Sequence, residues 1–372
     1  MKIIRTATVG ESLNTFCEGL LKELTDEGYE VIALSSPDVD LRELGEREGV
    51  RTIGIEMERH VSPLKDFVSL MKITRVLKQE KPDLVHSMTP KAGLLCMMAA
   101  KLAGVPIRLH TFTGLVWPTA TGTLRKILMM TDRITCACAT HIVPEGEGVK
   151  QDLQRCITKK PMKVLGYGNV RGVDMDYWQR RVKEKDNKLF TFVFVGRIVG
   201  DKGINELVSA FIRYHHENVD TRLLLVGPYE DNLDPVSPET KRLIETSDSI
   251  EAVGNQKDAR PFYEQSDVLV FPSYREGFPN VVLEAGAMEL PSIVTDINGS
   301  REIIEHGKNG LIVPPRDEQA LYDAMKWMAE HPDDRKKMAE NARPIVANRY
   351  EQGFVRQCLK NYYKEILFSK KN

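Results

Sequence analysis

Residues 268–285 read VLVFPSYREGFPNVVLEA. The apolar run Val268–Phe271 is short, rich in β-branched and aromatic side chains, and ends at a proline, so it predicts a buried strand. From Val281 onward the residues favour a helix, and Pro279 and Asn280 suit its start. The segment therefore predicts a strand, a loop and a helix, which is the repeating unit of parallel α/β folds.

Two carboxylates flank the start of this helix. Glu276 falls in the loop, and Glu284 lies about one turn inside the helix, on the face that looks back over the loop. Free backbone N–H groups and the positive end of the helix dipole lie between them and can hold an anion such as a phosphate. Two acceptors for hydroxyls beside a phosphate cradle suit a sugar nucleotide. Taken alone, such a pair is more often a set of solvated surface charges.

A second loop supplies two cations. The strand expected at Phe190–Val195 runs into Gly196 and Arg197, and a helix is expected at Ile204–Tyr214. In the glycine-bearing loop between them, Arg197 offers a bidentate fork to a diphosphate and Lys202 offers a compact point charge. The glycine spacing fits neither a P-loop nor a dinucleotide-binding fingerprint.

Together, the two segments resemble the retaining glycosyltransferases of family four, which have the GT-B fold. In that family a G-R-x-x-x-x-K-G loop binds the donor diphosphate, and Arg197 and Lys202 stand at its two cationic positions. An E-x(7)-E segment holds the sugar and the ribose, and Glu276 and Glu284 have that spacing. The donor-binding residues that the resemblance implies are Gly10, Gly196, Glu276, Gly277, Phe278, Pro279, Asn280, Val281 and Glu284.

The resemblance also implies an architecture: two Rossmann-like, doubly wound parallel-sheet domains that face a central cleft, with a C-terminal helix crossing back to the N-terminal domain. Strand and helix patterns do alternate along the 372 residues, a length that suggests two cores. The predicted domains are residues 1–165 with 350–372, which would bind the acceptor, and residues 166–349, which would bind the donor. A polar stretch at Gln179–Lys188 is expected to be an exposed linker.

Twelve strands are expected, six in each half. They lie near Lys2–Val9, Glu30–Leu34, Arg51–Ile55, Leu84–His86, Ile107–His110, His141–Val143, Phe190–Val195, Arg222–Val226, Ile250–Val253, Val268–Phe271, Ser292–Thr295 and Gly310–Val313. The expected helices include Leu64–Leu77, Leu94–Leu102, a helical run over Glu318–Ala347 and a last helix at Gln352–Phe368.

Charge is divided unevenly between the two predicted domains. The N-terminal one has 28 Lys plus Arg against 22 Asp plus Glu, a net of +6, and the C-terminal one has 24 against 31, a net of −7. A basic N-terminal domain suits an anionic partner or membrane face, although chance asymmetry on solvated faces explains it equally well. The overall net charge is −1 and no recognisable module is present, so nucleic-acid binding is not expected.

Cysteine and hydropathy patterns bear on the compartment. The six cysteines include no C-x-x-C pair, so neither a metal site nor a disulfide framework is expected. No run approaches about 18 apolar residues, and the first residues have no signal-peptide core. We therefore expect a cytoplasmic protein that acts at the inner face of the membrane through peripheral contact.

Three N-terminal segments sharpen the resemblance. Residues 57–66 (MERHVSPLKD), 81–93 (KPDLVHSMTPKAG) and 108–117 (RLHTFTGLVW) look like bacterial family-four enzymes that act on polyprenyl-diphosphate-linked sugars in capsule, O-antigen and glycoprotein glycan assembly. Lys91 follows a proline at an expected helix start, where a cation and free N–H groups can hold an acceptor diphosphate. Lys91 and Thr113 are the acceptor-binding residues that we expect.

One histidine and the loop after the first expected strand are further features of the N-terminal half. His110 ends an expected buried strand, where a histidine is more often structural, but the resemblance implies a cleft histidine that contacts the transferred sugar. Many relatives have a Gly-Gly pair after the first strand, whereas this chain has only Gly10.

The implied reaction moves a hexose or N-acetylhexosamine from a UDP-linked donor to a polyprenyl-diphosphate saccharide with retention of configuration. Its catalytic residues would be Arg197, Lys202, Glu276 and His110, with the two cations replacing a metal and each contributing about 2–4 kcal/mol. No cofactor is expected, because the nucleotide sugar is a substrate. The alternatives are a glycosyltransferase with a soluble acceptor, a sugar-nucleotide epimerase, and a binding protein with an inactive site.

Overall fold

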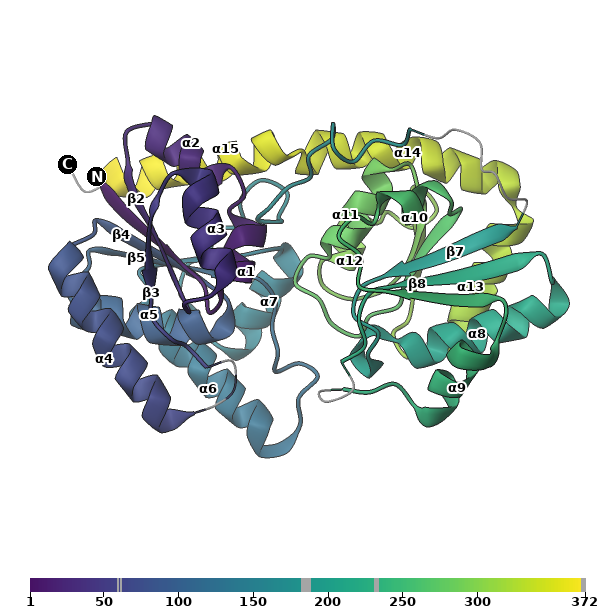
Figure 1. Ribbon diagram of the computed structural model, residues 1–372, viewed down its shortest axis with the longest axis horizontal. Coiled ribbons are helices and arrows are strands. Elements are labelled where there is room, and N and C mark those ends of the chain that lie inside the picture. Colours follow the sequence, from purple (N-terminus) through teal and green to yellow (C-terminus); the bar gives the residue numbers. More distant parts are fainter. Residues whose placement is uncertain (59, 61, 182–188, 231–233, 369–372) are drawn as a thin grey trace. The chain divides into compact units, whose positions relative to one another are not determined.

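The computed structural model describes residues 1–58, 60, 62–181, 189–230 and 234–368, which form two compact units (Figure 1). Unit 1 holds residues 1–172 and the chain from Gly353 onward, and unit 2 is Val173–Gln352. The predicted boundaries were 165/166 and 349/350. In the structure, residues 166–172 belong to unit 1 and residues 350–352 belong to unit 2.

Unit 1 is built on a six-stranded parallel sheet with the order β3-β2-β1-β4-β5-β6. The strands are β1 (Lys2–Thr6), β2 (Glu30–Ser35), β3 (Arg51–Gly54), β4 (Leu84–Met88), β5 (Ile107–Phe112) and β6 (His141–Pro144). The helices are α1 (Gly10–Phe16), α2 (Leu20–Asp26), α3 (Val39–Glu48), α4 (Pro63–Glu80), α5 (Pro90–Leu102), α6 (Gly122–Cys138), α7 (Glu147–Cys156) and α15 (Gln352–Phe368).

Both faces of this sheet are covered by helices. Successive strand residues point to opposite faces, so Ile3 joins one buried layer and Ile4 the other. The last helix, α15, contributes Leu359, Tyr363 and Leu367 to the Ile3 layer. The C-terminal helix therefore packs on the N-terminal sheet, as the resemblance implied.

A buried polar network fastens α15 to the sheet. The Arg5 guanidinium donates to the Tyr363 hydroxyl at 2.7 Å and contacts the His86 ring. His86 also shares a hydrogen bond of 2.7 Å with Thr111 on β5. Burial, followed by the charge of Arg5, lowers the pKa of His86 well below its ordinary value, so this imidazole is neutral.

Unit 2 repeats the topology with the order β12-β11-β10-β7-β8-β9, again all parallel. Its strands are β7 (Phe190–Val195), β8 (Thr221–Val226), β9 (Ile250–Gly254), β10 (Val268–Phe271), β11 (Ser292–Thr295) and β12 (Gly310–Val313). Its helices are the short η1 (Gly200–Lys202), α8 (Ile204–Glu217), α9 (Pro238–Thr246), α10 (Arg260–Glu264), α11 (Asn280–Ala287), α12 (Ser300–Ile303), α13 (Glu318–Glu330) and α14 (Pro332–Tyr350).

All twelve expected strands are present, and most differences from the expected elements lie at the ends of strands and helices. The first strand stops at Thr6 rather than Val9, and α5 begins at Pro90 rather than Leu94. The helical run over Glu318–Ala347 was wrong as one element, because Pro332 opens a new helix there: proline cannot donate the backbone hydrogen bond that would continue the first. Residues 182–188 of the predicted linker lie outside the described residues.

Each sheet reverses its strand order once, between β1 and β4 in unit 1 and between β7 and β10 in unit 2. In doubly wound sheets, ligands bind at the carboxyl ends of the strands on either side of such a reversal. Within the described residues, no helix is long and apolar enough to cross a bilayer.

Candidate active site

The loops after β7, β8 and β10 lie against one another in unit 2, and glycines make this possible. A Cβ on Gly227, whose φ is +145°, would lie 1.9 Å from the carbonyl oxygen of Gly196. A Cβ on Gly203, with φ of +71°, would lie 2.2 Å from the carbonyl oxygen of Pro272. Only glycine allows such approaches, so the cation-bearing loop is held directly beside the loop that carries Glu276.

Two ion pairs occupy this reversal point. Lys202 pairs with Glu276, and their side chains are only 14% and 16% exposed. The Lys202 ammonium also lies 5.3 Å from the centre of the Phe271 ring. Arg197, whose side chain is 42% exposed, pairs with Glu230 at 2.5 Å. The structure thus brings together Lys202 and Glu276, which the sequence pointed to separately, and adds Glu230, which the motifs did not indicate.

A further set of contacts fixes the β10 loop in place. The Arg275 guanidinium pairs with Asp201 at 2.8 Å, and the Tyr274 backbone N–H donates to the Asp201 carbonyl at 2.9 Å. The Tyr274 hydroxyl donates to Glu206 at 2.5 Å. Burial, and then this hydrogen bond, raise the pKa of Tyr274, so the phenol remains a donor. The loop that carries Glu276 is therefore anchored by residues other than Glu276 itself.

The E-x(7)-E segment enters α11 as the sequence predicts. Pro279 caps the helix that begins at Asn280, and Phe278 is buried against Tyr350. A Cβ on Gly299 would lie 2.4 Å from the carbonyl oxygen of Gly277, so the loop after β11 also packs on this segment.

Glu284 lies on the buried side of α11 and is 8% exposed. Burial, with a contribution from the Glu284 charge, raises the pKa of Tyr263 well above its ordinary value. The Tyr263 hydroxyl donates to the Val281 carbonyl at 3.2 Å. The interpretation of both glutamates as solvated surface charges is therefore wrong.

At the reversal point of unit 1, hydroxyl groups join the loop after β1 to the residue before α5. The hydroxyls of Thr8 and Thr89 lie 2.8 Å apart, and the Thr8 backbone N–H donates to Thr89 at 3.1 Å. Thr89 has a φ of +65°, which is strained for a residue other than glycine. This strain lies directly before α5.

Two predicted site residues at this end of unit 1 have protein partners. Lys91, in the first turn of α5, pairs with Asp66 of α4 at 2.6 Å and donates to the carbonyl of His60 at 2.9 Å. The Gly10 N–H donates to the Asp38 carboxylate at 2.8 Å, and a Cβ on Gly10 would lie 2.0 Å from that side chain. Gly10 is thus required for packing at the start of α1.

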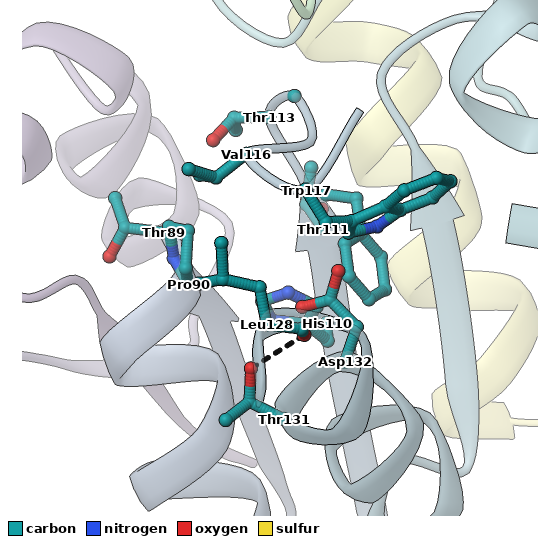
Figure 2. Close-up of a pocket in the computed structure, with 12 residues that line it drawn as sticks. Thr89, Pro90, His110, Thr111, Thr113, Val116, Trp117, Leu128, Thr131 and Asp132 are labelled. Carbon is teal, nitrogen blue, oxygen red and sulfur yellow. Dashed lines mark hydrogen bonds between the residues drawn. The ribbon is translucent and has the colours of Figure 1, made fainter. Parts of the chain in front are cut away.

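His110 is almost fully buried near the end of β5. Its Nδ1 shares a hydrogen bond of 2.7 Å with the Ser87 hydroxyl, and a Cβ on Gly93 would lie 2.4 Å from its Cε1. Burial lowers the pKa of His110 from 6.5 to about 3, so the ring is neutral at physiological pH. His110 and Thr113 line the same small pocket, shown in Figure 2.

Among the residues that the structure describes, no group of three or more His, Cys, Asp or Glu side chains is placed to hold a metal ion. Two doubly wound domains, with an Arg–Lys loop facing an E-x(7)-E segment at the reversal point of one of them, define a glycosyltransferase of the GT-B fold.

Comparison with known proteins gives the family. The family model described as "Glycosyl transferase 4-like domain" matches residues 13–168, and "Glycosyl transferases group 1" matches residues 190–331. The capsular polysaccharide biosynthesis glycosyltransferase CapM of Staphylococcus aureus is 31% identical over 98% of this chain and 97% of its own length. The chain belongs to the bacterial family-four glycosyltransferases.

Two other similar proteins have known ligands, which their names or structures state. The UDP-Gal:alpha-D-GlcNAc-diphosphoundecaprenol alpha-1,3-galactosyltransferase of Escherichia coli is 27% identical over 84% of this chain and 83% of its own length. The solved structure of Anabaena HepE in complex with UDP has a TM-score of 0.80 at 16% identity, covering 98% of this chain and 100% of that one.

Proposed function

We propose that this chain is a retaining, metal-independent glycosyltransferase that moves a sugar from a UDP-linked donor to a saccharide carried on polyprenyl diphosphate. The observation that carries the proposal is the Lys202–Glu276 pair beside Arg197 at the reversal point of unit 2. The printed donor and acceptor of the Escherichia coli relative, and the UDP bound to HepE, support the choice of substrates.

The proposed chemistry follows from the charges. Breaking the bond between the anomeric carbon and the phosphate oxygen leaves negative charge on the nucleoside diphosphate, which Arg197 and Lys202 would stabilise. When Lys202 turns from Glu276 to the diphosphate, the freed carboxylate can accept hydrogen bonds from sugar hydroxyls. The acceptor hydroxyl attacks from the leaving-group face, its oxygen bonds to the anomeric carbon, and its proton passes to the departing phosphate.

Metal independence has a direct test. Two cations on one loop provide the charge that a divalent ion supplies in other phosphate-transfer sites. We expect transfer to continue in excess EDTA at an unchanged rate. A complete loss that Mg²⁺ restores would contradict this part of the proposal.

Helix α4 carries features of a membrane-binding surface. Leu64, Phe67, Val68 and Met71 are all exposed, and their spacing of three, four and seven residues places them on one face. Exposed cations of α4 flank this stripe: Lys65, Lys72 and Arg75. Helix α6 carries a second exposed set of cationic and apolar side chains: Leu124, Arg125, Lys126, Ile127 and Met130. Apolar side chains flanked by cations suit the surface of an anionic bilayer, so we include peripheral membrane contact in the proposal.

The acceptor class is tested by one comparison. A single UDP-sugar is offered with a saccharide on polyprenyl diphosphate and with the same saccharide lacking lipid and phosphate. We expect kcat/KM to be at least ten-fold higher for the lipid diphosphate, and Lys91→Ala to reduce that preference. Equal values for both acceptors, unchanged in Lys91→Ala, would favour an enzyme with a soluble acceptor.

Membrane contact is tested by sedimentation with anionic vesicles. We expect the double variant Leu64→Ser, Phe67→Ser to bind less than the unaltered protein, and binding to weaken in salt. Val219→Ser is the matched control, because Val219 is an exposed apolar residue of unit 2. Equal losses in both variants would contradict a role for α4.

A further inference from the structure

A small pocket in unit 1 contains a carboxyl group that the proposed reaction does not use. Asp132 extends from α6 into this pocket, which it lines with His110, Thr113, Trp117, Leu128 and Thr131 (Figure 2). The pocket offers about 20 Å³, which is room for one group of the size of a water molecule. It can therefore seat a single hydroxyl but not a sugar ring.

The surroundings of Asp132 are largely apolar. Burial raises the pKa of its carboxyl from 3.8 to about 7. The Trp117 indole N–H lies nearby and favours the ionised form, although the contact falls short of full hydrogen-bond geometry. Within the described part of the chain, no Lys or Arg contributes to this pKa, so the carboxylate retains acceptor capacity for a ligand.

The charged and titratable groups around the pocket are few. His110 comes from β5 and is neutral; Cys136 lies one turn further along α6, and burial raises the pKa of its thiol to about 12. The Arg125 guanidinium lies 5.8 Å from the Trp117 ring, on the same helix as Asp132. The start of α5 contributes only uncharged residues to the lining. A titration near neutral pH at this pocket would therefore belong to Asp132.

The position of the pocket matches the proposed acceptor side of the reaction. Thr89 and Pro90, which line it, immediately precede Lys91 at the reversal point of unit 1. Of the pocket residues, the sequence resemblance placed His110 near the transferred sugar and Thr113 near the acceptor. A hydroxyl bound here would lie among them, at the carboxyl ends of the strands.

We propose that Asp132 is an acceptor-binding residue, whose carboxylate accepts a hydrogen bond from one hydroxyl of the acceptor sugar seated in this pocket beside His110. The inference rests on the proposed function and adds a specificity-determining residue to it. No bond to Asp132 forms or breaks, and the proton of the attacking hydroxyl still leaves on the donor phosphate.

The test uses the full-length protein, a UDP-sugar and N-acetylglucosamine diphosphate on a short polyprenyl chain. In Asp132→Asn we expect the acceptor KM to rise about ten-fold or more, because a hydrogen bond to a charged group is lost, while the Kd for UDP stays unchanged. In the unaltered protein, kcat/KM for the acceptor should rise between pH 6 and pH 8 as the carboxyl ionises, and Asp132→Asn should abolish that rise.

Two further variants make the result interpretable. Asp26→Asn is the control, because it removes an exposed carboxylate from α2 in the same unit. Asp132→Ala removes the side chain without adding an amide, and it should raise the acceptor KM as well. An unchanged acceptor KM in both Asp132 variants, or an equal loss of UDP affinity, would overturn the inference while leaving the proposed function intact. Failure of the unaltered protein to transfer sugar to any lipid-diphosphate acceptor would instead overturn the proposed function.

Discussion

The two units share one strand order, yet their reversal points differ in charge. In unit 2 the point is occupied by two ion pairs, Lys202 with Glu276 and Arg197 with Glu230. In unit 1 two threonine hydroxyls lie at the corresponding point, with one ion pair, Lys91 with Asp66, in the first turn of α5, and the nearby imidazole of His110 is neutral. The same topology therefore carries two ion pairs at one reversal point, and at the other a single ion pair, Lys91 with Asp66, beside hydroxyl groups and a neutral imidazole.

This difference indicates which ligand each unit suits. An exposed ion pair stabilises a protein by about 0–1 kcal/mol, so a diphosphate can replace Glu230 beside the 42% exposed Arg197 at small cost. A small, largely apolar pocket that contains a carboxyl group disfavours a free anion but suits a hydroxyl group, whose hydrogen bonds are stronger where water is excluded. On this argument, unit 2 is built for the polyanionic donor and the pocket of unit 1 for one uncharged part of the acceptor.

The largest expected effect tests the cations of unit 2. Because Arg197 and Lys202 should act mainly on charge that develops as the diphosphate leaves, Arg197→Ala and Lys202→Ala should each lower kcat by about 100-fold or more. Steady-state kinetics with the true donor and acceptor measure this, with circular dichroism to show that the fold survives. Lys308→Ala is the matched control, since Lys308 forms an exposed ion pair with Glu305 in the same unit. Full activity in either loop variant would remove the leaving-group role.

Much of this comparison was accessible from the sequence, and the missing parts have physical reasons. Short β-branched runs and the helices between them predict all twelve strands, because hydrophobic periodicity is a local property. Lys202 and Glu276 were found by motif, but their ion pair depends on two loops brought together by strand order. Asp132 sits in an amphipathic helix with no motif around it, and only tertiary packing places it in a pocket.

The next effect separates the two glutamates of unit 2. Glu284→Gln should weaken binding of UDP itself, because the proposed ribose contact needs no sugar. Glu276→Gln should leave UDP affinity nearly intact, because the proposed contact of Glu276 is with the sugar, but it should impair binding of the UDP-sugar. Each lost charge-assisted hydrogen bond is worth roughly 1.5–3 kcal/mol, or about 10-fold to 100-fold in Kd. Titration calorimetry with UDP and with UDP-sugar measures both; equal affinity of both variants for UDP would contradict this division.

A third prediction concerns unit 1, where two pocket residues should affect stability with opposite dependence on pH. His110 has a folded pKa of about 3, below its ordinary 6.5, so the unfolded chain binds the proton first and stability falls as the pH drops below about 6.5. Asp132 has a folded pKa of about 7, above its ordinary 3.8, so its cost to stability grows as the pH rises from about 4 to 7.

Urea unfolding at several pH values measures both slopes. In His110→Gln, the loss of stability between pH 7 and pH 5 should be smaller than in the unaltered protein by about 2 kcal/mol. Asp132→Asn should be the more stable protein at pH 8, by on the order of 2 kcal/mol once its partial exposure is allowed for. A variant that gains stability while losing acceptor affinity would mark a carboxyl kept for function. Parallel curves for all three proteins would show that burial at this pocket has little effect on either group.

The smallest expected effect is the response of the two sites to salt. The Debye length falls from about 10 Å at 0.1 M salt to about 3 Å at 1 M, and screening acts most on exposed charges. The Kd for UDP should therefore rise roughly two-fold to five-fold over this range, and Arg197, at 42% exposure, should account for more of the rise than Lys202, at 14%. Arg197→Ala should flatten the salt dependence more than Lys202→Ala does. The effect of Asp132→Asn on the acceptor KM, measured with a short-chain acceptor, should instead change less with salt, because the small pocket screens its carboxyl less than an exposed charge is screened. If salt changed the Asp132 effect as strongly as the UDP affinity, the contrast between the more exposed Arg197 and the carboxyl in the small pocket of unit 1 would not hold.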